Sequence, residues 1–223
     1  QKEEIASRKM YCIANSMDSD KERDIRERLN HNNIYQQHFK NDNPTIIYCG
    51  RIQKLKRLEL LVDCAAAFKE EGRPVNMVFV GKDVEQVNID QYAKDKNVAD
   101  SVWMYGPCYD DEVLGQLFYN AHVCVSPGNV GLTAIHSLTF GCPVVTHNNF
   151  AYQMPEFEAI RQGETGTFFE QGNAKSLKQE IEYWICADVD KREQTRRKAF
   201  EEIDRKWNIH YQMEVIKKVL NET

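Results

Sequence analysis

Two basic side chains near the start of one segment are well suited to bind phosphate. Arg51 follows directly after an apolar run at 45–49, and Lys56 lies five residues further on, where a helix is predicted to begin. Arginine offers a planar fork of N–H donors and lysine a compact point charge, so the pair suits a diphosphate. The alternative is a solvated helix start in which Lys54, Lys56 and Arg57 are interchangeable surface groups.

A second stretch, Ser126–Thr146, has the form of a strand, a turn, a helix and another strand. Residues 127–129 break regular structure after a short apolar run, the helix-like segment Val130–Phe140 follows, and Gly141 ends it. The first turn of such a helix has unpaired N–H groups and the positive end of the helix dipole, and Gly131 has no Cβ to keep a ligand away. This unit predicts a phosphate or diphosphate site, with an ordinary turn whose N–H groups bind water as the alternative.

Strands and helices alternate along most of the chain. Apolar runs bounded by turn residues predict strands at 45–49, 75–80, 101–105, 122–125, 143–145 and 165–170. Periodic apolar spacing predicts helices at 55–70, 84–96, 110–120, 130–140, 155–162, 174–185, 191–206 and 209–220. This order is typical of an α/β fold with a doubly wound parallel sheet, in which ligands bind where strands end and helices begin.

Glycines follow four of the predicted strands, at Gly50, Gly81, Gly106 and Gly128. Glycines gathered at one edge of a sheet favour a close approach between backbone and ligand, although tight turns also use glycine. None of them belongs to a GxGxxG fingerprint, so a dinucleotide-binding domain of the NAD type is not supported.

Residues 1–43 differ in composition from the rest. Apart from the apolar run Met10–Ala14, they are highly charged and rich in asparagine and glutamine. The apolar residues within Ser19–Phe39 form only a thin stripe. This pattern predicts a helix that lies on the surface and is not part of the core.

Composition restricts the function further. The 223-residue chain is 42% hydrophobic and 28% charged with a formal net charge of −5, which is typical of a soluble globular protein and not of a nucleic-acid-binding one. It has no apolar run that could span a membrane and no secretory signal. Its seven cysteines form no CxxC pair and its six histidines have no zinc-ligand spacing, which predicts reduced thiols in the cytoplasm and no metal site. Because it begins at Gln1 and not at Met, we expect a fragment or a processed chain.

Five motifs occur in the order found in one known family. They are GR-x4-K from Gly50, VFVGK from Val78, WMYGP from Trp103, SPGNVGLTAIHSLTFGCPVV from Ser126 and PEFEAI-x2-GETGTFF from Pro155. Together they resemble the C-terminal, donor-binding domain of the GT-B glycosyltransferases, in the retaining, family 4-like group. The resemblance covers about residues 44–187 and extends to the C-terminal helices and, more weakly, to the linker stretch Asn15–Asp18.

The resemblance implies a Rossmann-like half of a GT-B fold in three parts. Residues 1–43 would be the end of a missing N-terminal domain and the linker, 44–187 the nucleotide-sugar-binding domain, and 188–223 helices that brace the missing domain. The parent protein would be a retaining glycosyltransferase of polysaccharide biosynthesis that moves a hexose from a UDP- or GDP-sugar to a hydroxyl of a saccharide or glycolipid. Its partner would be the N-terminal acceptor domain, through which it could touch a membrane, and no cofactor is implied. The fragment alone would transfer no sugar.

The same resemblance assigns residues to the donor site. Arg51 and Lys56 are implied as the catalytic groups that hold the diphosphate without a metal ion. The implied donor-binding residues are Gly50, Gly81, Lys82, Tyr105, Gly106, Asn129, Val130, Gly131, Leu132, Thr133 and His136.

The chain departs from the family pattern at two positions. The family usually carries two glutamates eight residues apart, and this chain has Gly128 and His136 there. The implied ribose contact would then fall to His136, and the sugar contact to Asn129 or the 147–149 loop. Loss of both carboxylates leaves open a non-catalytic domain that binds a nucleotide or a partner protein. A nucleotide-sugar epimerase of the same fold is a third alternative, with Glu156 as its acid or base.

Overall fold

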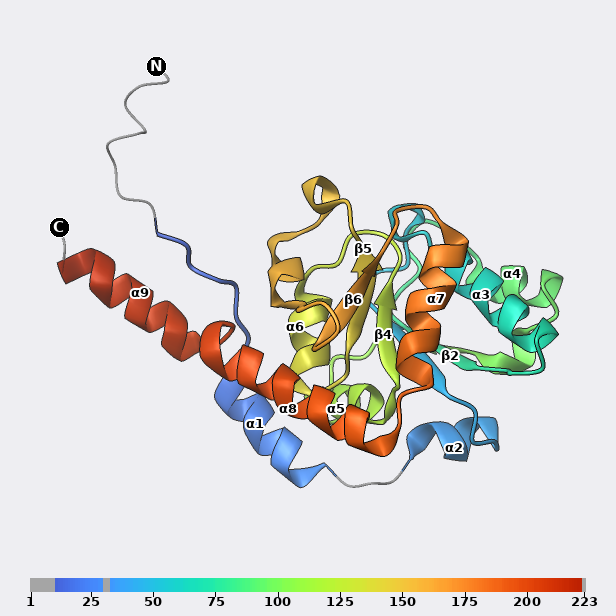
Figure 1. Ribbon diagram of the computed structural model, residues 1–223, viewed down its shortest axis with the longest axis horizontal. Helices are drawn as coiled ribbons and strands as arrows, with labels where there is room; N and C mark the ends of the chain where they lie inside the picture. Colours follow the sequence, from blue (N-terminus) through green and yellow to red (C-terminus); the bar gives the residue numbers. More distant parts are fainter. Residues whose placement is uncertain (1–10, 30–32, 222–223) are drawn as a thin grey trace, which may run out of the picture.

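The computed structural model describes residues 11–29 and 33–221 and contains a six-stranded sheet (Figure 1). The strands are β1 (Thr45–Cys49), β2 (Asn76–Val80), β3 (Val102–Gly106), β4 (Val123–Ser126), β5 (Val144–His147) and β6 (Gly166–Phe169). Their order is β3-β2-β1-β4-β5-β6, and every neighbouring pair is parallel. The predicted doubly wound α/β fold is therefore confirmed.

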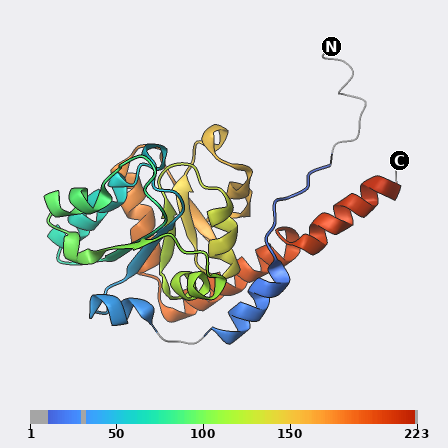
Figure 2. The same cartoon turned by 180° about the vertical axis from the view of Figure 1, so that it is seen from behind.

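Helices cover both faces of the sheet (Figures 1 and 2). The core on one face includes residues of α1 (Ser19–Arg28), α2 (Ile34–Phe39), α5 (Asp111–Asn120), α6 (Leu132–Thr139) and α8 (Val189–Lys206). The core on the other face includes residues of α3 (Glu59–Glu70), α4 (Ile89–Asp95) and α7 (Ala174–Ile185). Because both faces are covered, the central strand β4 is buried along its whole length, as a continuous apolar run predicts.

The N-terminal helices contradict the prediction for residues 19–39. The segment forms two helices, α1 and α2, and each inserts a side chain into the core: Ile25 is 3% exposed and Tyr35 2%. The Tyr35 hydroxyl also donates a hydrogen bond to the Leu117 carbonyl at 2.6 Å. A thin apolar stripe predicts a surface helix, but one large buried residue per helix is enough to make it part of the core. The predicted apolar run 10–14 and the predicted 19–39 helix each include positions outside the described residues.

The helix predicted over 55–70 is divided in two. A 3-10 turn, η1 (Lys54–Lys56), comes first, Arg57 then adopts the left-handed conformation at φ 53°, and α3 begins at Glu59. A residue with positive φ cannot continue a right-handed helix. Lys56 therefore lies on a turn and not on a helix start.

The helix predicted over 84–96 is also shorter than expected. The Asp83 carboxylate accepts hydrogen bonds from three backbone N–H groups, at residues 85, 87 and 88. These bonds hold the segment in a loop, because a side chain that binds nearby backbone competes with helix formation. As a result α4 begins only at Ile89.

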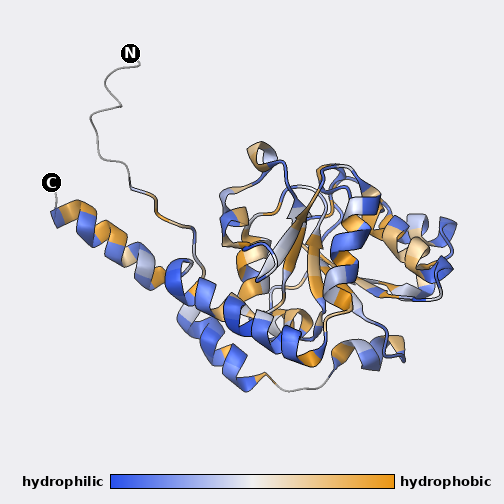
Figure 3. Cartoon of the chain, in the orientation of Figure 1, coloured by the Kyte–Doolittle hydropathy of each residue, from blue (hydrophilic) through white to orange (hydrophobic). Residues whose placement is uncertain are grey.

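The last helix, α9 (Ile209–Asn221), extends away from the sheet beyond the end of α8 (Figures 1 and 2). The Gln212 side chain donates to the Ala14 carbonyl at 2.6 Å, so the N-terminal segment lies beside it. Met213, Ile216 and Leu220 are exposed apolar residues of α9, and Figure 3 shows this hydrophobic stripe along the helix. The predicted boundaries of the three parts stay predictions, and residues 1–10, 30–32, 222 and 223 lie outside the description. Within the described ranges, no helix has the length and apolarity needed to cross a membrane.

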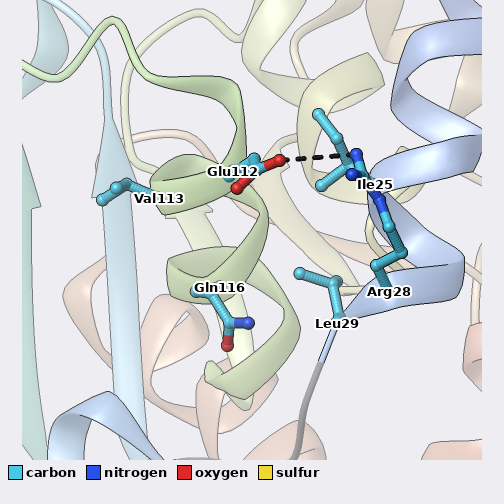
Figure 4. Close-up of a pocket in the computed structure, with 6 residues that line it drawn as sticks. All are labelled: Ile25, Arg28, Leu29, Glu112, Val113 and Gln116. Atoms are coloured by element: carbon cyan, nitrogen blue, oxygen red, sulfur yellow. Dashed lines mark ion pairs between the residues drawn. The ribbon is translucent and has the colours of Figure 1, made fainter.

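Apolar packing and two ion pairs, Lys21 with Asp111 and Arg28 with Glu112, join α1 to α5. The two helices enclose a hollow of about 390 Å³ lined by Ile25, Leu29 and Val113 among others (Figure 4). The Arg28 guanidinium and the Glu112 carboxylate pair across it at 3.4 Å. Both charged groups are largely exposed, so this pair contributes at most about 1 kcal/mol and the buried Ile25 contributes more.

A buried carboxyl group lies where α1 meets α6. The Glu22 side chain is 5% exposed, with Oε1 3.5 Å from Nε2 of His136, and Oε2 has no hydrogen-bond partner among the described residues. Burial raises the pKa of Glu22 to about 7, and the nearby Asp111 and Asp18 carboxylates add to the rise. Burial also lowers the pKa of His136. Below about pH 7 the carboxyl therefore retains its proton, and at neutral pH the imidazole is uncharged.

We expect Glu22→Gln to stabilise the folded protein by roughly 1–3 kcal/mol at about pH 8. The native carboxyl loses its proton only near pH 7, whereas in the unfolded chain it does so near its ordinary pKa of 4.5. The native state thus binds the proton more tightly, so wild-type stability falls as the pH rises between these values. The advantage of the variant should shrink toward zero as the pH is lowered to about 4.5, in urea unfolding followed by circular dichroism.

The control is Glu27→Gln, which makes the same change at an exposed position of α1. It should show no comparable pH dependence. A Glu22→Gln variant that is less stable than the wild type at about pH 8 would contradict this account of the buried carboxyl.

Candidate functional site

The two central strands of the sheet are β1 and β4, where the order of connections reverses. They pair through Ile46 with Val123 and Ile47 with Cys124. The loops after both strands leave the same edge of the sheet, and in open α/β sheets ligands bind at such a reversal point.

A cleft of about 530 Å³ lies at this edge. Its lining comes from the loops after β1 and β4, the start of α6, the linker and the segment before β6. The lining residues are Asn15, Tyr48, Cys49, Gly50, Arg51, Lys56, Ser126, Asn129, Gly131, Leu132, Thr133, Met154 and Glu156. Seven of the predicted site residues are thus brought together: Gly50, Arg51, Lys56, Asn129, Gly131, Leu132 and Thr133.

Lys56 joins the two loops. Its ammonium donates to the backbone carbonyl of Asn129 at 2.6 Å and to the Oδ1 atom of the same residue at 2.7 Å. Partial burial, and then the charge of Arg51, lower the pKa of Lys56. Among the described residues no carboxylate pairs with Lys56 or with the exposed guanidinium of Arg51. The cleft therefore holds two cations that form no ion pair with the described residues, together with one carboxyl group, that of Glu156.

The N-terminus of α6 faces the same cleft. Gly131 is its N-cap residue and supplies no side-chain hydrogen bond, so the first-turn N–H groups lack the usual side-chain acceptor. The Thr133 hydroxyl donates to the Cys49 carbonyl at 2.8 Å, which fixes the helix start against the end of β1. An uncapped helix start beside two cations is a favourable place for an anion.

Gly128 is packed beneath the turn that carries Lys56. Its N–H donates to the Lys56 carbonyl at 2.9 Å, and a Cβ at this position would lie 2.3 Å from the Leu55 carbonyl oxygen. Any other residue would push this turn away. The resemblance predicts a glutamate at position 128. The backbone of residues 55 and 56 fills the space that its side chain would need.

Two predicted site residues point elsewhere. The Val130 N–H donates to Oε1 of Gln153 at 2.7 Å and the residue is fully buried, so its amide is not available to a ligand in this conformation. His136 does not line the cleft and pairs with Glu22 on the side of α1. The motif predicts both as site residues, but the Val130 amide binds Gln153 and the His136 ring pairs with Glu22.

Four further predicted residues lie on the same sheet edge but outside the cleft lining: Gly81, Lys82, Tyr105 and Gly106. The Gly50 N–H donates to the Val80 carbonyl, and the Gly81 N–H donates to the Gly106 carbonyl. These two bonds extend the hydrogen-bonding of the sheet by one residue beyond β1 and β2. Gly81 has φ 153°, and a Cβ there would lie 1.8 Å from the Gly50 carbonyl oxygen. Its role in this structure is close packing against Gly50.

Glu156 is a cleft residue that the motifs pointed to only as an epimerase candidate. It is 5% exposed, its Oε1 accepts from the Asn15 side chain at 2.9 Å, and its Oε2 has no hydrogen-bond partner in the described part of the chain. Asn15 was predicted only as part of a linker. Because 141 residues separate the two, no local pattern could have found the pair.

The described residues contain no group of three or more histidine, cysteine, aspartate or glutamate side chains that could hold a metal ion. All seven cysteines are free thiols, and burial raises the pKa of Cys49 at the cleft to about 12. That thiol remains protonated at neutral pH and is a poor nucleophile.

Comparison with known proteins gives a consistent picture. The model of the family described as Glycosyl transferases group 1 matches residues 30–202. The chain is 24% identical over 147 residues to EpsD of Bacillus subtilis, a provisionally named glycosyltransferase, covering 65% of this chain and 37% of that protein.

Solved structures show the same fold. HepE of Anabaena, crystallised with UDP, superimposes with a TM-score of 0.75 at 18% identity, covering 95% of this chain and 57% of its own. Sucrose-phosphate synthase of Thermosynechococcus elongatus superimposes with a TM-score of 0.75 at 22% identity, covering 97% of this chain and 53% of its own. The chain thus spans little more than half the length of these relatives.

We expect Gly128→Ala to destabilise the folded protein by about 1–3 kcal/mol, because its Cβ would collide with the backbone of the Lys56 turn. Gly131→Ala is the matched control, since its Cβ would meet only Met154 at an ordinary 3.7 Å. Chemical denaturation measures both. Equal losses in the two variants would show that the turn does not depend on the close approach at Gly128.

Proposed function

The chain belongs to the glycosyl transferases group 1 family, and on that premise we propose that its cleft binds the diphosphate of a nucleotide sugar. The parent protein would be a retaining glycosyltransferase that moves a hexose from a UDP- or GDP-sugar to a hydroxyl of a saccharide or glycolipid. The observation that carries this proposal is the Lys56 ammonium, held against Asn129 beside the uncapped start of α6.

Charge development explains what these groups would do. When the bond between the sugar and the diphosphate breaks, negative charge grows on the leaving phosphate oxygen. Fixed cations and oriented N–H groups bind this charge more strongly in the transition state than in the ground state, and so lower the barrier. Lys56 has three N–H donors and donates two of them in hydrogen bonds to Asn129, which leaves one for a phosphate oxygen. Arg51 would approach from the exposed side, and the scheme needs no metal ion or other cofactor because the protein supplies the positive charge.

Glu156 would act on the sugar side of the cleft. Its unpartnered Oε2 can accept a hydrogen bond from a sugar hydroxyl, and Asn15 fixes the carboxylate in place. Gly128 and His136 cannot supply this carboxylate, because one has no side chain and the other pairs with Glu22. We therefore assign sugar recognition to Glu156 and not to the motif positions.

The comparisons support a uridine donor as the first to test, since HepE was crystallised with UDP and with UDP-glucose. The free thiols fit a reducing compartment such as the cytoplasm. Since the chain spans about half of such relatives, we propose that an acceptor domain elsewhere in a longer protein completes the site. The exposed apolar stripe of α9 is the surface that would brace the acceptor domain. Contact with a membrane that carries a glycolipid would come through the acceptor domain.

A second candidate is a non-catalytic domain that binds a nucleotide or a partner protein. The substitution of both motif glutamates favours it, because neither Gly128 nor His136 can give a carboxylate to the donor. The two functions separate at the level of sugar transfer, which the non-catalytic domain would lack. A nucleotide-binding domain would still bind a diphosphate in the cleft, whereas a partner-binding domain would not.

We expect Lys56→Gln to weaken UDP binding by about 10- to 100-fold, because a charge-assisted hydrogen bond to phosphate is lost. Arg51→Gln should weaken it less, by about 3- to 10-fold, since the guanidinium is exposed. Calorimetric titration measures both against Lys54→Gln, which removes an exposed cation from the same turn and should leave binding unchanged. Equal UDP affinity in all three variants would rule out the cleft as the diphosphate site.

We also expect residues 1–223 alone to bind UDP without transferring sugar, and a longer protein with an acceptor domain to transfer it. The physical reason is that the acceptor hydroxyl needs a second surface to position it near the donor. Radiolabelled transfer from UDP-glucose and other donors measures the activity. Sugar transfer by the 223 residues alone would contradict the proposal that a separate acceptor domain is needed for transfer.

A further inference from the structure

A second concentration of positive charge lies at the opposite edge of the sheet from the cleft. A hollow of about 250 Å³ opens there between the first turns of α8, the end of α5 and the residue before β4. We call it the Arg192 pocket, and its lining includes Tyr119, His122, Arg192, Glu193 and Arg196. It lies at the amino ends of the strands, whereas the donor cleft lies at their carboxyl ends, so the two sites are separated by the length of β4.

Arg192 is a partly buried cation without a partner. Its guanidinium has no hydrogen bond or ion pair with any described residue. Burial, and then the like charge of Arg196, lower its pKa. Five N–H donors in a rigid fork are therefore available in a place where an unpaired charge is unfavourable.

Arg196 lies one helical turn further along α8 and is held in a fixed position. Its Nη1 pairs with Glu193 at 3.0 Å, its Nη2 donates to the Tyr119 carbonyl at 3.2 Å, and its guanidinium carbon lies 3.8 Å from the centre of the Tyr119 ring. Gly141 makes room for the side chain, since a Cβ there would lie 2.3 Å from Cγ of Arg196. Even so, Nε of Arg196 is buried without a hydrogen-bond partner in the described structure.

Two neutral groups add donors beside the arginines. His122 accepts a hydrogen bond from the Thr45 N–H on Nδ1 at 3.1 Å, so its ring proton is on Nε2. Burial, with the charge of Arg192, lowers the pKa of His122 to about 3, and the ring stays neutral. Thr195 is 2% exposed, and its hydroxyl also has no partner among the described residues, in a small hollow shared with His122, Arg192 and Arg196.

We propose that the Arg192 pocket is a second anion site that binds the phosphate group of a small molecule, either inorganic phosphate or a phosphate monoester. Two arginines and one glutamate leave the pocket with a net positive charge in a chain whose total is −5. The unused donors are more than one carboxylate can satisfy, whereas a phosphate dianion presents three or more strong acceptor oxygens. The arginines supply the charge-assisted bonds, and His122 supplies a neutral one.

The Arg192 pocket should also affect stability in a way that a structural arginine would not. Without a ligand, Arg192 is a desolvated cation beside another cation, so Arg192→Gln should leave the ligand-free protein as stable as the wild type or more stable. The increase in melting temperature that phosphate gives the wild type should be lost in the variant. An arginine that only supports packing would lower the melting temperature equally with and without phosphate.

The test is titration of the protein with inorganic phosphate and with methyl phosphate, followed by calorimetry and by the ring resonances of His122. We expect saturable binding that shifts those resonances and becomes about 10-fold weaker or more in Arg192→Gln. Arg192→Lys keeps the positive charge and loses the planar guanidinium fork. Its phosphate affinity should lie between that of the wild type and that of Arg192→Gln. Arg197→Gln is the control, because it removes an exposed arginine from the same helix and should leave binding unchanged.

A parallel titration of Lys56→Gln separates this site from the donor cleft. The shift of the His122 resonances by phosphate should persist in that variant, whatever the fate of nucleotide binding. If methyl phosphate binds and inorganic phosphate does not, the site is one for monoesters, and the reverse result assigns it to the free ion. The proposal is overturned if neither shifts the His122 resonances, if Lys56→Gln abolishes the shift, or if Arg192→Gln and Arg197→Gln bind phosphate equally.

Discussion

The contact between the Lys56 ammonium and Asn129 is the interaction on which the candidate site depends. It joins the loop after β1 to the loop after β4, the two loops that leave the centre of the sheet where the strand order reverses. The contact requires Arg57 in the left-handed conformation, which ends the η1 turn, and Gly128, which lets the turn approach. With the turn in place, a cation, an exposed guanidinium and an uncapped helix start face one cleft. No single element could create this arrangement, because each contributes only part of the positive potential.

The same geometry gives a physical account of the unusual motif positions. A glutamate at residue 128 would displace the turn that carries Lys56, and His136 belongs to a buried pair with Glu22. The carboxylate that remains in the cleft comes from Glu156, held by Asn15 from the N-terminal linker. The linker therefore contributes to the cleft, although it is distant from the central motif in the sequence. In the proposed function, recognition of the phosphate and of the sugar would thus depend on different parts of the chain.

The fold could be predicted from sequence because its signals are local. Apolar runs between turn residues predict all six strands, and Asp110 caps α5 by accepting hydrogen bonds from the backbone N–H groups of residues 112 and 113. Arg51, Lys56 and Gly131 could be found for the same reason, since each follows a strand or precedes a helix. The rest depended on tertiary contacts. The start of α3 is set by the conformation of Arg57, the Val130 amide is occupied by Gln153, and Tyr35 makes α2 part of the core through Leu117. None of these contacts has a signature within a short window of sequence.

The central claim is that a nucleotide diphosphate binds against Lys56, and the titration of its amino group tests this most directly. With selectively labelled lysine, the pKa of Lys56 can be followed by NMR in the free protein and with saturating UDP. In the free protein, partial burial and Arg51 hold this pKa below its ordinary value. The account predicts that UDP raises the pKa of Lys56, because a bound diphosphate favours the charged form. A Lys56 pKa that is the same with and without UDP would contradict it.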